Sequence, residues 1–290
     1  MLRIAASASV FVWLIPVVLK AKMAVKKIRG INIAYDDLGS GEPIVFIHGH
    51  PFNSSMWKYQ TEHFAQNYRL ILPDLRGYGE TDLSGPKIML DEMALDIAYL
   101  LDELNIEKAI FCGLSMGGQI LLDFYRLFPE RVKAIIIADS DARAESPESY
   151  QLRIGLAELI SKEGIKKYTD DHILHYLAPV SRNNQEVYQH LYQMMTETSD
   201  EGAAAAHRGR AERRDHLSIL SGIEVPALIV VGAEDYFTPL PIAKLMSDRI
   251  PLATLVCIPE TGHLPNMEAP ELFNAAVEDF LNQVNIRYQE

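Results

Sequence analysis

Cysteine is scarce in this sequence, with only Cys112 and Cys257 among 290 residues. Neither cysteine stands at metal-ligand spacing, which excludes the common thiolate metal sites. Both lie in apolar, strand-like runs, so we predict two buried free thiols rather than a disulfide. Two thiols also cannot supply the disulfide framework of a small secreted domain.

Basic residues are in deficit as well. The chain has 27 Lys and Arg against 39 Asp and Glu, a formal net charge of -12. This balance argues against nucleic acid or an anionic membrane surface as a partner. Internal repeats and low-complexity tracts are lacking too. The apolar content of 48% suffices for one large core, or for a core with a small inserted domain.

Long apolar runs are rare, and the main exception lies near the N-terminus. Residues 4–19 are mostly apolar, follow Arg3 and precede Lys20 and Lys22. Their length suits a signal-peptide core or a short membrane anchor, although no small-x-small cleavage site follows. Alternatively, residues 1–22 are an upstream translation artefact, because Met23 begins an ordinary soluble sequence. We expect a cytoplasmic protein if translation starts at Met23, and an exported or membrane-anchored one otherwise.

Strand-like and helix-like segments alternate along most of the chain. Buried-strand patterns occupy residues 31–35, 43–47, 68–72, 110–112, 132–137, 227–231 and 253–258, and residues 89–104 have apolar positions at helical spacing. The first strand belongs to a hairpin, with its turn at residues 39–41. Such alternation predicts an α/β fold, with a mostly parallel sheet and helices on both faces.

The alternation stops at about residue 142 and resumes at about residue 217. Between them lie only polar helical stretches, such as 150–161 and 185–198. We therefore predict a helical cap over residues 142–217, inserted after the strand-like run 132–137. The core would then comprise residues 23–141 and 218–290.

Ser115 lies in the motif Gly-Leu-Ser-Met-Gly at residues 113–117, between a strand-like run and a helix-like run. That context is typical of a nucleophile elbow. The turn is so tight that the residues flanking the serine must be small. It also exposes the hydroxyl at a helix N-terminus, where developing negative charge is favoured. An isolated match of this kind is also compatible with an ordinary strand-to-helix turn, so the interpretation of Ser115 as a nucleophile depends on the other motifs.

Two further candidates follow later strands. Asp235 comes shortly after the run 227–231, and His263 shortly after the run 253–258. Carboxyl ends of strands collect catalytic groups in open α/β sheets, so Ser115, Asp235 and His263 have the order nucleophile, acid and base. Competing candidates for the acid are Glu234, Asp139 and Asp141.

The strand 43–47 ends in His-Gly-His-Pro at residues 48–51, where turning backbone could supply an oxyanion hole. Together with Asp-Leu-Arg-Gly-Tyr-Gly at 74–79 and the motifs above, this pattern resembles the α/β-hydrolase superfamily over residues 24–285. It is most similar to small serine carboxylesterases. Relatives of that group include cofactor-free haloperoxidases (perhydrolases), 3-oxoadipate enol-lactonase and pimeloyl-carrier-protein methyl esterases.

The resemblance implies a sheet of about eight strands and a role for each motif residue. Ser115 would be the nucleophile, His263 the base and Asp235 the acid, because the Gly-x-x-Asp-x-x-x-Pro spacing matches the usual acid site. Backbone N–H groups of His50 and Met116 would form the oxyanion hole. The remaining motif residues would brace loops, namely His48, Asp74, Arg76 and Tyr78. No cofactor and no metal are expected.

For the substrate site we predict contacts from His50, Phe52, Trp57 and Leu264. Further candidates for an apolar acyl pocket are Tyr150, Ile154, Leu174 and Tyr176. A serine at the elbow indicates acyl transfer, so we expect hydrolysis of small to medium carboxylic esters through an acyl-enzyme. Lactone opening and perhydrolysis on the same triad are alternatives, and a non-catalytic ligand-binding protein is a third. The expected partner is a small-molecule ester, with a membrane partner only if residues 4–19 are an anchor; a homo-oligomer stays open.

Overall fold

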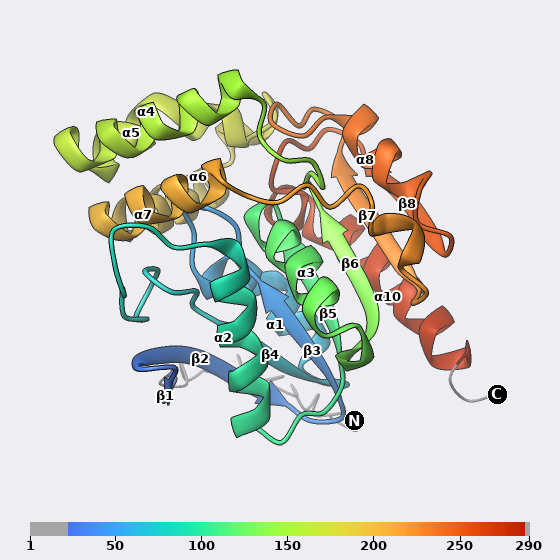
Figure 1. Cartoon of the computed structure of the whole chain (residues 1–290). Coiled ribbons are helices and arrows are strands. Elements are labelled where there is room, and N and C mark those ends of the chain that lie inside the picture. The colour runs from blue at the N-terminus through green and yellow to red at the C-terminus, as the bar shows by residue number, and fades with distance from the viewer. Residues whose placement is uncertain (1–22, 288–290) are drawn as a thin grey trace, which may run out of the picture.

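The computed structural model describes residues 23–287, and an eight-stranded sheet forms its centre (Figure 1). The strand order is β1-β2-β4-β3-β5-β6-β7-β8. β1 and β2 are antiparallel to their neighbours, and the strands from β4 to β8 run parallel. The bounds are β1 Ala24–Ile28, β2 Ile31–Gly39, β3 Glu42–Ile47, β4 Tyr68–Pro73, β5 Ala109–Leu114, β6 Val132–Ala138, β7 Ala227–Gly232 and β8 Ala253–Ile258.

This architecture confirms the predicted α/β fold. Each run that the sequence analysis interpreted as a strand forms one, and β1 is an additional strand. Its sequence, Ala-Val-Lys-Lys-Ile, carries two lysines and is mostly exposed. An edge strand needs little apolar surface, so β1 lacks the buried pattern by which the other strands are recognised.

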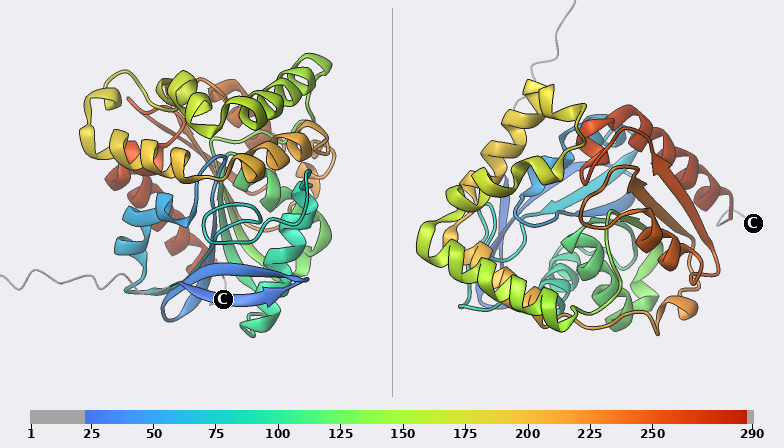
Figure 2. Two further views of the ribbon diagram at one scale, coloured as in Figure 1. Left: turned by 90° about the vertical axis from the view of Figure 1, so that its left-hand side faces the viewer. Right: turned by 90° about the horizontal axis from the view of Figure 1, so that it is seen from above.

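Helices cover both faces of the sheet (Figure 2). Side chains of β5 alternate between the two cores, with Phe111 in one and Cys112 in the other. The Phe111 face packs against α2 (Leu90–Glu103), α3 (Met116–Leu127) and α8 (Leu240–Ser247). The opposite face packs against α1 (Lys58–Phe64) and α10 (Pro270–Arg287). Burial on both faces explains why the central strands are almost continuously apolar.

Four helices lie between β6 and β7, within the residues predicted as a cap. These inserted helices are α4 (Pro147–Glu163), α5 (Ile165–Tyr176), α6 (Gln185–Glu197) and α7 (Asp200–Ala211). Figure 1 shows them side by side beyond the carboxyl ends of the strands. Side chains of Ser146, Asn184 and Ser199 cap three of them. The short elements are α9 (Pro265–Glu268), η1 (Ser54–Trp57), η2 (Pro129–Arg131), η3 (Ser181–Asn183) and η4 (Leu220–Gly222).

Glycines allow α7 to lie directly against the body of the protein. A Cβ at Gly209 would stand 1.6 Å from the carbonyl oxygen of Ile88, and one at Gly202 would stand 1.9 Å from that of Gly77. Neither distance leaves room for a side chain. These two approaches therefore fix the distance between the α7 backbone and the segments around Gly77 and Ile88.

The two cysteines differ in exposure. Cys112 is buried, whereas Cys257 is exposed, so the prediction of two buried thiols was wrong for Cys257. The reason is its position in β8, an edge strand whose side chains are only partly covered. An apolar run does not reveal whether a strand lies at the centre or the edge of a sheet.

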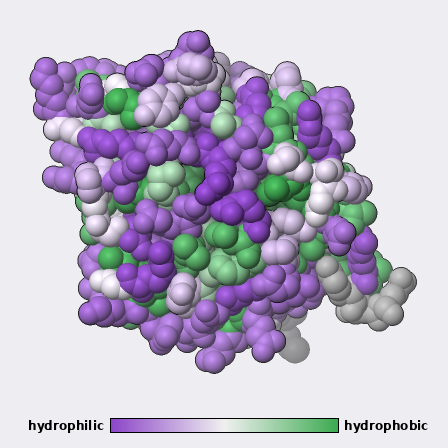
Figure 3. Space-filling view, in the orientation of Figure 1, coloured by the Kyte–Doolittle hydropathy of each residue, from purple (hydrophilic) through white to green (hydrophobic). Residues whose placement is uncertain are grey.

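The apolar segment of residues 4–19 lies outside the described residues. Within residues 23–287, no helix combines the length and apolarity needed to cross a bilayer. On the face shown in Figure 3, hydrophobic side chains form separate patches among hydrophilic ones. Scattered apolar side chains are normal on a protein surface and indicate no particular partner.

Candidate active site

Ser115 stands at the junction of β5 and α3 in a strained backbone conformation, as the elbow motif predicted. Its φ is 56°, in the left-handed region that residues other than glycine rarely adopt. The Ser115 N–H donates to the carbonyl oxygen of Ala138 at 2.9 Å, and its own carbonyl accepts from Ser140 Oγ at 2.7 Å. These bonds to the end of β6 hold the turn in place.

The glycines of the elbow are required by close backbone approaches. A Cβ at Gly113 would lie 2.4 Å from the carbonyl oxygen of Gly117. A Cβ at Gly117 would lie 2.1 Å from that of Ile47, at the end of β3. Glycine at both positions therefore lets β3, β5 and α3 meet below the serine.

Asp235 and His263 form a buried pair. The Nδ1 of His263 is 2.9 Å from each carboxylate oxygen of Asp235, and the two residues are 2% and 4% exposed, respectively. Asp235 also accepts from the N–H of Phe237 and the hydroxyl of Thr238. Burial alone would raise the pKa of Asp235, but His263 and these hydrogen bonds lower it to about 2. The carboxylate is therefore charged and orients the imidazole.

Asp139, the main competitor for the acid role, has a different environment. Its Oδ1 accepts from the N–H of Gly232 at 2.8 Å, and its Oδ2 has no hydrogen-bond partner among the described residues. Burial, reinforced by the charge of Asp235, raises the pKa of Asp139 well above its usual range. Burial thus favours the neutral form of Asp139, and it is Asp235 that contacts the imidazole of His263.

The remaining acid candidates face elsewhere. Asp141 pairs with Arg143 on the wall of the cavity described below, and Glu234 is exposed. Asp139, Asp235 and His263 also offer atoms within 4.8 Å of one another, the spacing of a metal site. Because Nδ1 of His263 already bonds to Asp235, this arrangement suits proton transfer better than metal binding.

The loop after β3 holds two histidines with separate surroundings. His48 Nδ1 donates to the carbonyl of Gly49 at 2.8 Å, and its Nε2 accepts from the N–H of Leu75 at 3.0 Å. Burial lowers the pKa of His48, so a neutral ring braces the loop, as expected. His50 Nδ1 is 2.6 Å from the hydroxyl of Tyr78. Met116 is the first residue of α3, and the first N–H groups of a helix have no intrahelical acceptors.

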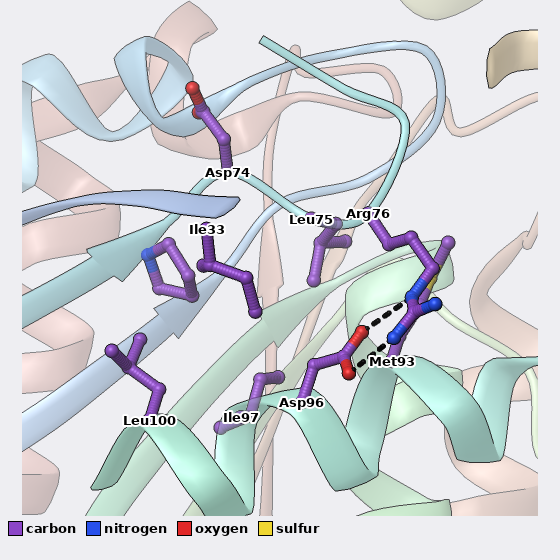
Figure 4. A pocket seen from close by; sticks show the side chains of 9 residues that line it. Ile33, Asp74, Leu75, Arg76, Met93, Asp96, Ile97 and Leu100 are labelled. Atoms are coloured by element: carbon purple, nitrogen blue, oxygen red, sulfur yellow. Dashed lines mark hydrogen bonds and ion pairs between the residues drawn. The ribbon is translucent and has the colours of Figure 1, made fainter. Parts of the chain in front are cut away.

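Asp74 and Arg76 make structural contacts below this loop. Asp74 accepts from the N–H groups of Ser54 and Glu80, and Arg76 donates to both oxygens of Asp96 at 2.6 and 2.7 Å. Figure 4 shows the Arg76–Asp96 pair beside a small cavity between α2 and the β4 end. The volume of about 10 Å³ holds at most a water molecule. The bracing role predicted for these residues agrees with these contacts.

A much larger cavity, of about 480 Å³, lies between the sheet and the inserted helices. Ser115, His263 and the side chain of His50 line it, as does Tyr176. A cavity of this size can hold a small ligand. The structure thus brings the predicted nucleophile and base to one cavity, with Asp235 behind the base.

Three of the four predicted substrate contacts do not line this cavity. Phe52, Trp57 and Leu264 are fully buried in the core on the α10 side of the sheet. The ring of Trp57 packs 5.0 Å from that of Phe46, centroid to centroid, and Phe52 packs 5.5 Å from Tyr176. Of the three, Phe52 packs behind the lining residue Tyr176. The prediction was wrong because local spacing does not specify which way a loop side chain points.

Sequence reasoning also missed the polar wall opposite Ser115. The cavity is lined from the inserted segment by charged and imidazole side chains: Arg143, Glu145, Arg153, His172, His175, His207, Arg210 and Arg213. One available signal was the spacing of His207 and Arg210, polar residues one turn apart on an otherwise small-residue stretch of α7.

Comparisons with known proteins identify the family and the fold. A family model described as the Alpha/beta hydrolase family matches residues 44–276. The 3-oxoadipate enol-lactonase 2 of Acinetobacter baylyi is 30% identical over 260 residues, covering 89% of this chain and 96% of that protein. A thermophilic esterase from Thermogutta terrifontis, solved with malate bound, is 34% identical with a TM-score of 0.88, covering 91% of this chain and 99% of that one. The enol-lactonase from Burkholderia xenovorans LB400 shares the fold, with a TM-score of 0.84 at 24% identity over 89% of this chain and 100% of that one.

Proposed function

The chain belongs to the alpha/beta hydrolase family, and from that premise we propose that it is a serine esterase for small to medium acyl esters. The observation that carries the proposal is the buried Asp235–His263 pair, whose imidazole shares a cavity with the strained Ser115. Strained residues of this kind cluster at catalytic sites. The esterase and lactonase relatives support acyl chemistry.

The reaction would proceed through an acyl-enzyme. His263 removes the proton of the Ser115 hydroxyl as its oxygen attacks the ester carbonyl, while Asp235 holds the ring and stabilises its charged form. The N–H groups of His50 and Met116 donate to the oxyanion. The imidazolium returns the proton to the departing alcohol. Water, activated in the same way, then releases the acid and restores the serine.

Hydrolysis of p-nitrophenyl esters from acetate to laurate tests this proposal. We expect Ser115→Ala to lower kcat by at least about a thousandfold, as loss of a triad nucleophile does. Ser218→Ala is the matched control, because Ser218 is exposed and distant in sequence from the motifs. The chain-length profile measures the acyl pocket. Full activity in Ser115→Ala, or no turnover by the folded parent protein, would contradict the proposal.

Lactone opening is the second candidate. It is favoured by the 30% identity to an enol-lactonase along nearly the whole chain. The same triad would open a lactone, with the departing alcohol remaining attached to the acyl group. A series of five- and six-membered lactones, compared with the open-chain esters by kcat/KM, separates the two. Higher values for the lactones would favour the lactonase.

A further inference from the structure

The cavity wall formed by α4, α7 and their flanking segments carries an excess of positive charge. Four guanidinium groups line it, and two carboxylates accompany them: Arg143, Arg153, Arg210 and Arg213, with Asp141 and Glu145. The chain as a whole has a formal net charge of -12. The inside of the cavity therefore has the opposite sign of charge from the protein as a whole.

Ion pairs account for three of these arginines. Arg143 pairs with Asp141 at 2.8 Å, and Arg153 and Arg213 share the carboxylate of Glu145. These three guanidinium groups are thereby engaged by the two carboxylates. The fourth guanidinium, that of Arg210, takes part in none of these pairs.

Arg210 is nevertheless one of the most buried cations of the described chain. It is 7% exposed, and its Nε is buried without a hydrogen-bond partner among the described residues. Burial, together with the charges of Arg153 and Arg213, lowers the pKa of Arg210 to about 9. It is therefore still charged at neutral pH. Glu145 attracts it at longer range, but that carboxylate is already shared by Arg153 and Arg213. A buried charge without a direct ion pair is strongly unfavourable, which points to an anion arriving from the cavity.

Two imidazoles adjoin this arginine. His207 lies one turn before it on α7, and both ring nitrogens of His207 are buried without partners among residues 23–287. Its ring centroid is 4.2 Å from that of His50, whose Nε2 also lacks a partner there. Burial lowers the pKa of both rings well below the usual range. A neutral imidazole carries one N–H, so His207 has one to donate, and Nε2 of His50 carries it in the tautomer whose Nδ1 accepts from the hydroxyl of Tyr78.

We propose that Arg210, His207 and the side chain of His50 bind a carboxylate carried by the substrate. Guanidinium groups bind carboxylates through two parallel hydrogen bonds, and the imidazole N–H groups can complete the coordination. His50 connects this subsite to the reaction centre, because its backbone N–H belongs to the suggested oxyanion hole. The inference rests on the proposed function and narrows the substrate class to anionic esters or lactones.

The test compares esters that differ only in charge. One pair places the carboxylate on the acyl side, namely mono-p-nitrophenyl adipate and p-nitrophenyl methyl adipate. The other places it on the alcohol side, namely 4-butanoyloxybenzoate and its methyl ester. The readout is the ratio of kcat/KM for the anionic and neutral members, each corrected for spontaneous hydrolysis. In the parent protein we expect the ratio to exceed about ten in one of the two pairs, because a hydrogen bond to a charged group stabilises the bound anionic member by at least about that factor.

Arg210→Gln should lower that ratio by about ten- to a hundredfold, because the charged donor is replaced by a neutral one. Arg210→Lys should restore part of it, since a lysine keeps the charge but not the planar pair of donors. Arg214→Gln is the matched control: this neighbouring arginine has a side chain that is 60% exposed, and the ratio should not change. An unchanged ratio in Arg210→Gln would overturn the assignment of Arg210.

The outcomes separate the subsite from the catalytic proposal. Equal kcat/KM for both members of each pair would overturn the subsite and leave the esterase intact. No turnover of any ester, with Ser115 unreactive to a fluorophosphonate, would instead overturn the proposed function. If Arg210→Gln fails to fold by circular dichroism, competition in the parent protein decides. Adipate should inhibit neutral-ester hydrolysis more strongly than adipamide; equal inhibition, or stronger inhibition by inorganic phosphate, would overturn the carboxylate assignment.

Discussion

Two carboxyl groups lie near the imidazole of His263, and their pKa values are shifted in opposite directions. Asp235 receives hydrogen bonds on both oxygens, including those from His263. Asp139 receives one, from the N–H of Gly232. Both are buried, so the interaction with His263 and the additional donors favour the charged form of Asp235, whereas burial and the charge of Asp235 favour the neutral form of Asp139. This difference concerns single side chains, and it has a measurable consequence for the dependence of stability on pH.

Asp139→Asn should become more stable than the parent protein as pH rises. Burial raises the pKa of Asp139 above the ordinary value of 3.8, so its contribution to stability is present below 3.8 and is lost as pH rises through the higher folded pKa. Asparagine cannot ionise, and its amide oxygen can still accept from Gly232. Urea unfolding at about pH 4 and pH 8 should show the variant gaining roughly 1 kcal/mol or more relative to the parent.

Asp235→Asn is the control of opposite sign. The pKa of Asp235 is lowered to about 2, so its stabilising contribution is present above 3.8 and is lost as pH falls towards 2. This variant should therefore be less stable than the parent at neutral pH, and the difference should shrink in acid. Parallel pH curves for Asp139→Asn and the parent would contradict the raised pKa of Asp139.

At the scale of elements, the elbow depends on how closely three segments approach. β3, β5 and α3 meet where Gly113 and Gly117 leave no room for a Cβ. The strained φ of Ser115 follows from this crossing, because the chain must reverse from strand to helix within one residue. Helix and strand propensities alone would not hold the serine in that conformation. The contacts between elements do so.

Gly117→Ala should therefore misplace the nucleophile. The added Cβ would stand 2.1 Å from the carbonyl oxygen of Ile47, so α3 or β3 must shift. Displacement of a catalytic group by about 1 Å costs on the order of a hundredfold in rate, and we expect kcat/KM for p-nitrophenyl butyrate to fall by that much.

Gly155→Ala is the matched control for that substitution. Gly155 lies within α4, and a Cβ there would meet no atom within 4 Å. Alanine in an open helical position should raise the free energy of unfolding by about 0.5–1 kcal/mol and leave turnover as it was. If Gly117→Ala retained the kcat/KM of Gly155→Ala, the close approach would have no catalytic importance.

On the scale of the whole molecule, the sheet separates two cores, and its central strands are protected on both faces. Cys112 lies in β5 at the centre of this arrangement, and burial raises the pKa of its thiol. Cys257 lies in the edge strand β8 and is exposed. Reaction of Cys257 therefore needs no unfolding, whereas reaction of Cys112 requires the core around the central strands to open.

A thiol reagent should distinguish them. We expect Ellman's reagent to modify one of the two cysteines promptly in the native protein, and the second only when urea unfolds the chain. Cys257→Ser should remove the prompt reaction and Cys112→Ala the slow one. Prompt reaction of both thiols at neutral pH would mean that the centre of the sheet opens locally.

The sequence by itself determined the elements and the order of the motifs. Apolar strand runs, the small residues around Ser115, and polar residues after strand ends are local features, so spacing along the chain reveals them. The edge strand β1 and the exposure of Cys257 were missed because both depend on which strands become neighbours.

Only the tertiary structure decided which side chains face the cavity. Phe52, Trp57 and Leu264 turned into the core, whereas Arg210 and His207 were brought over Ser115 by the packing of α7 against the body. The choice between Asp139 and Asp235 also required the contacts between β6, β7 and the His263 loop. The physical reason is that such contacts join residues far apart in the chain. Local patterning describes neighbours along the chain, so it does not reveal which distant segment a side chain will face.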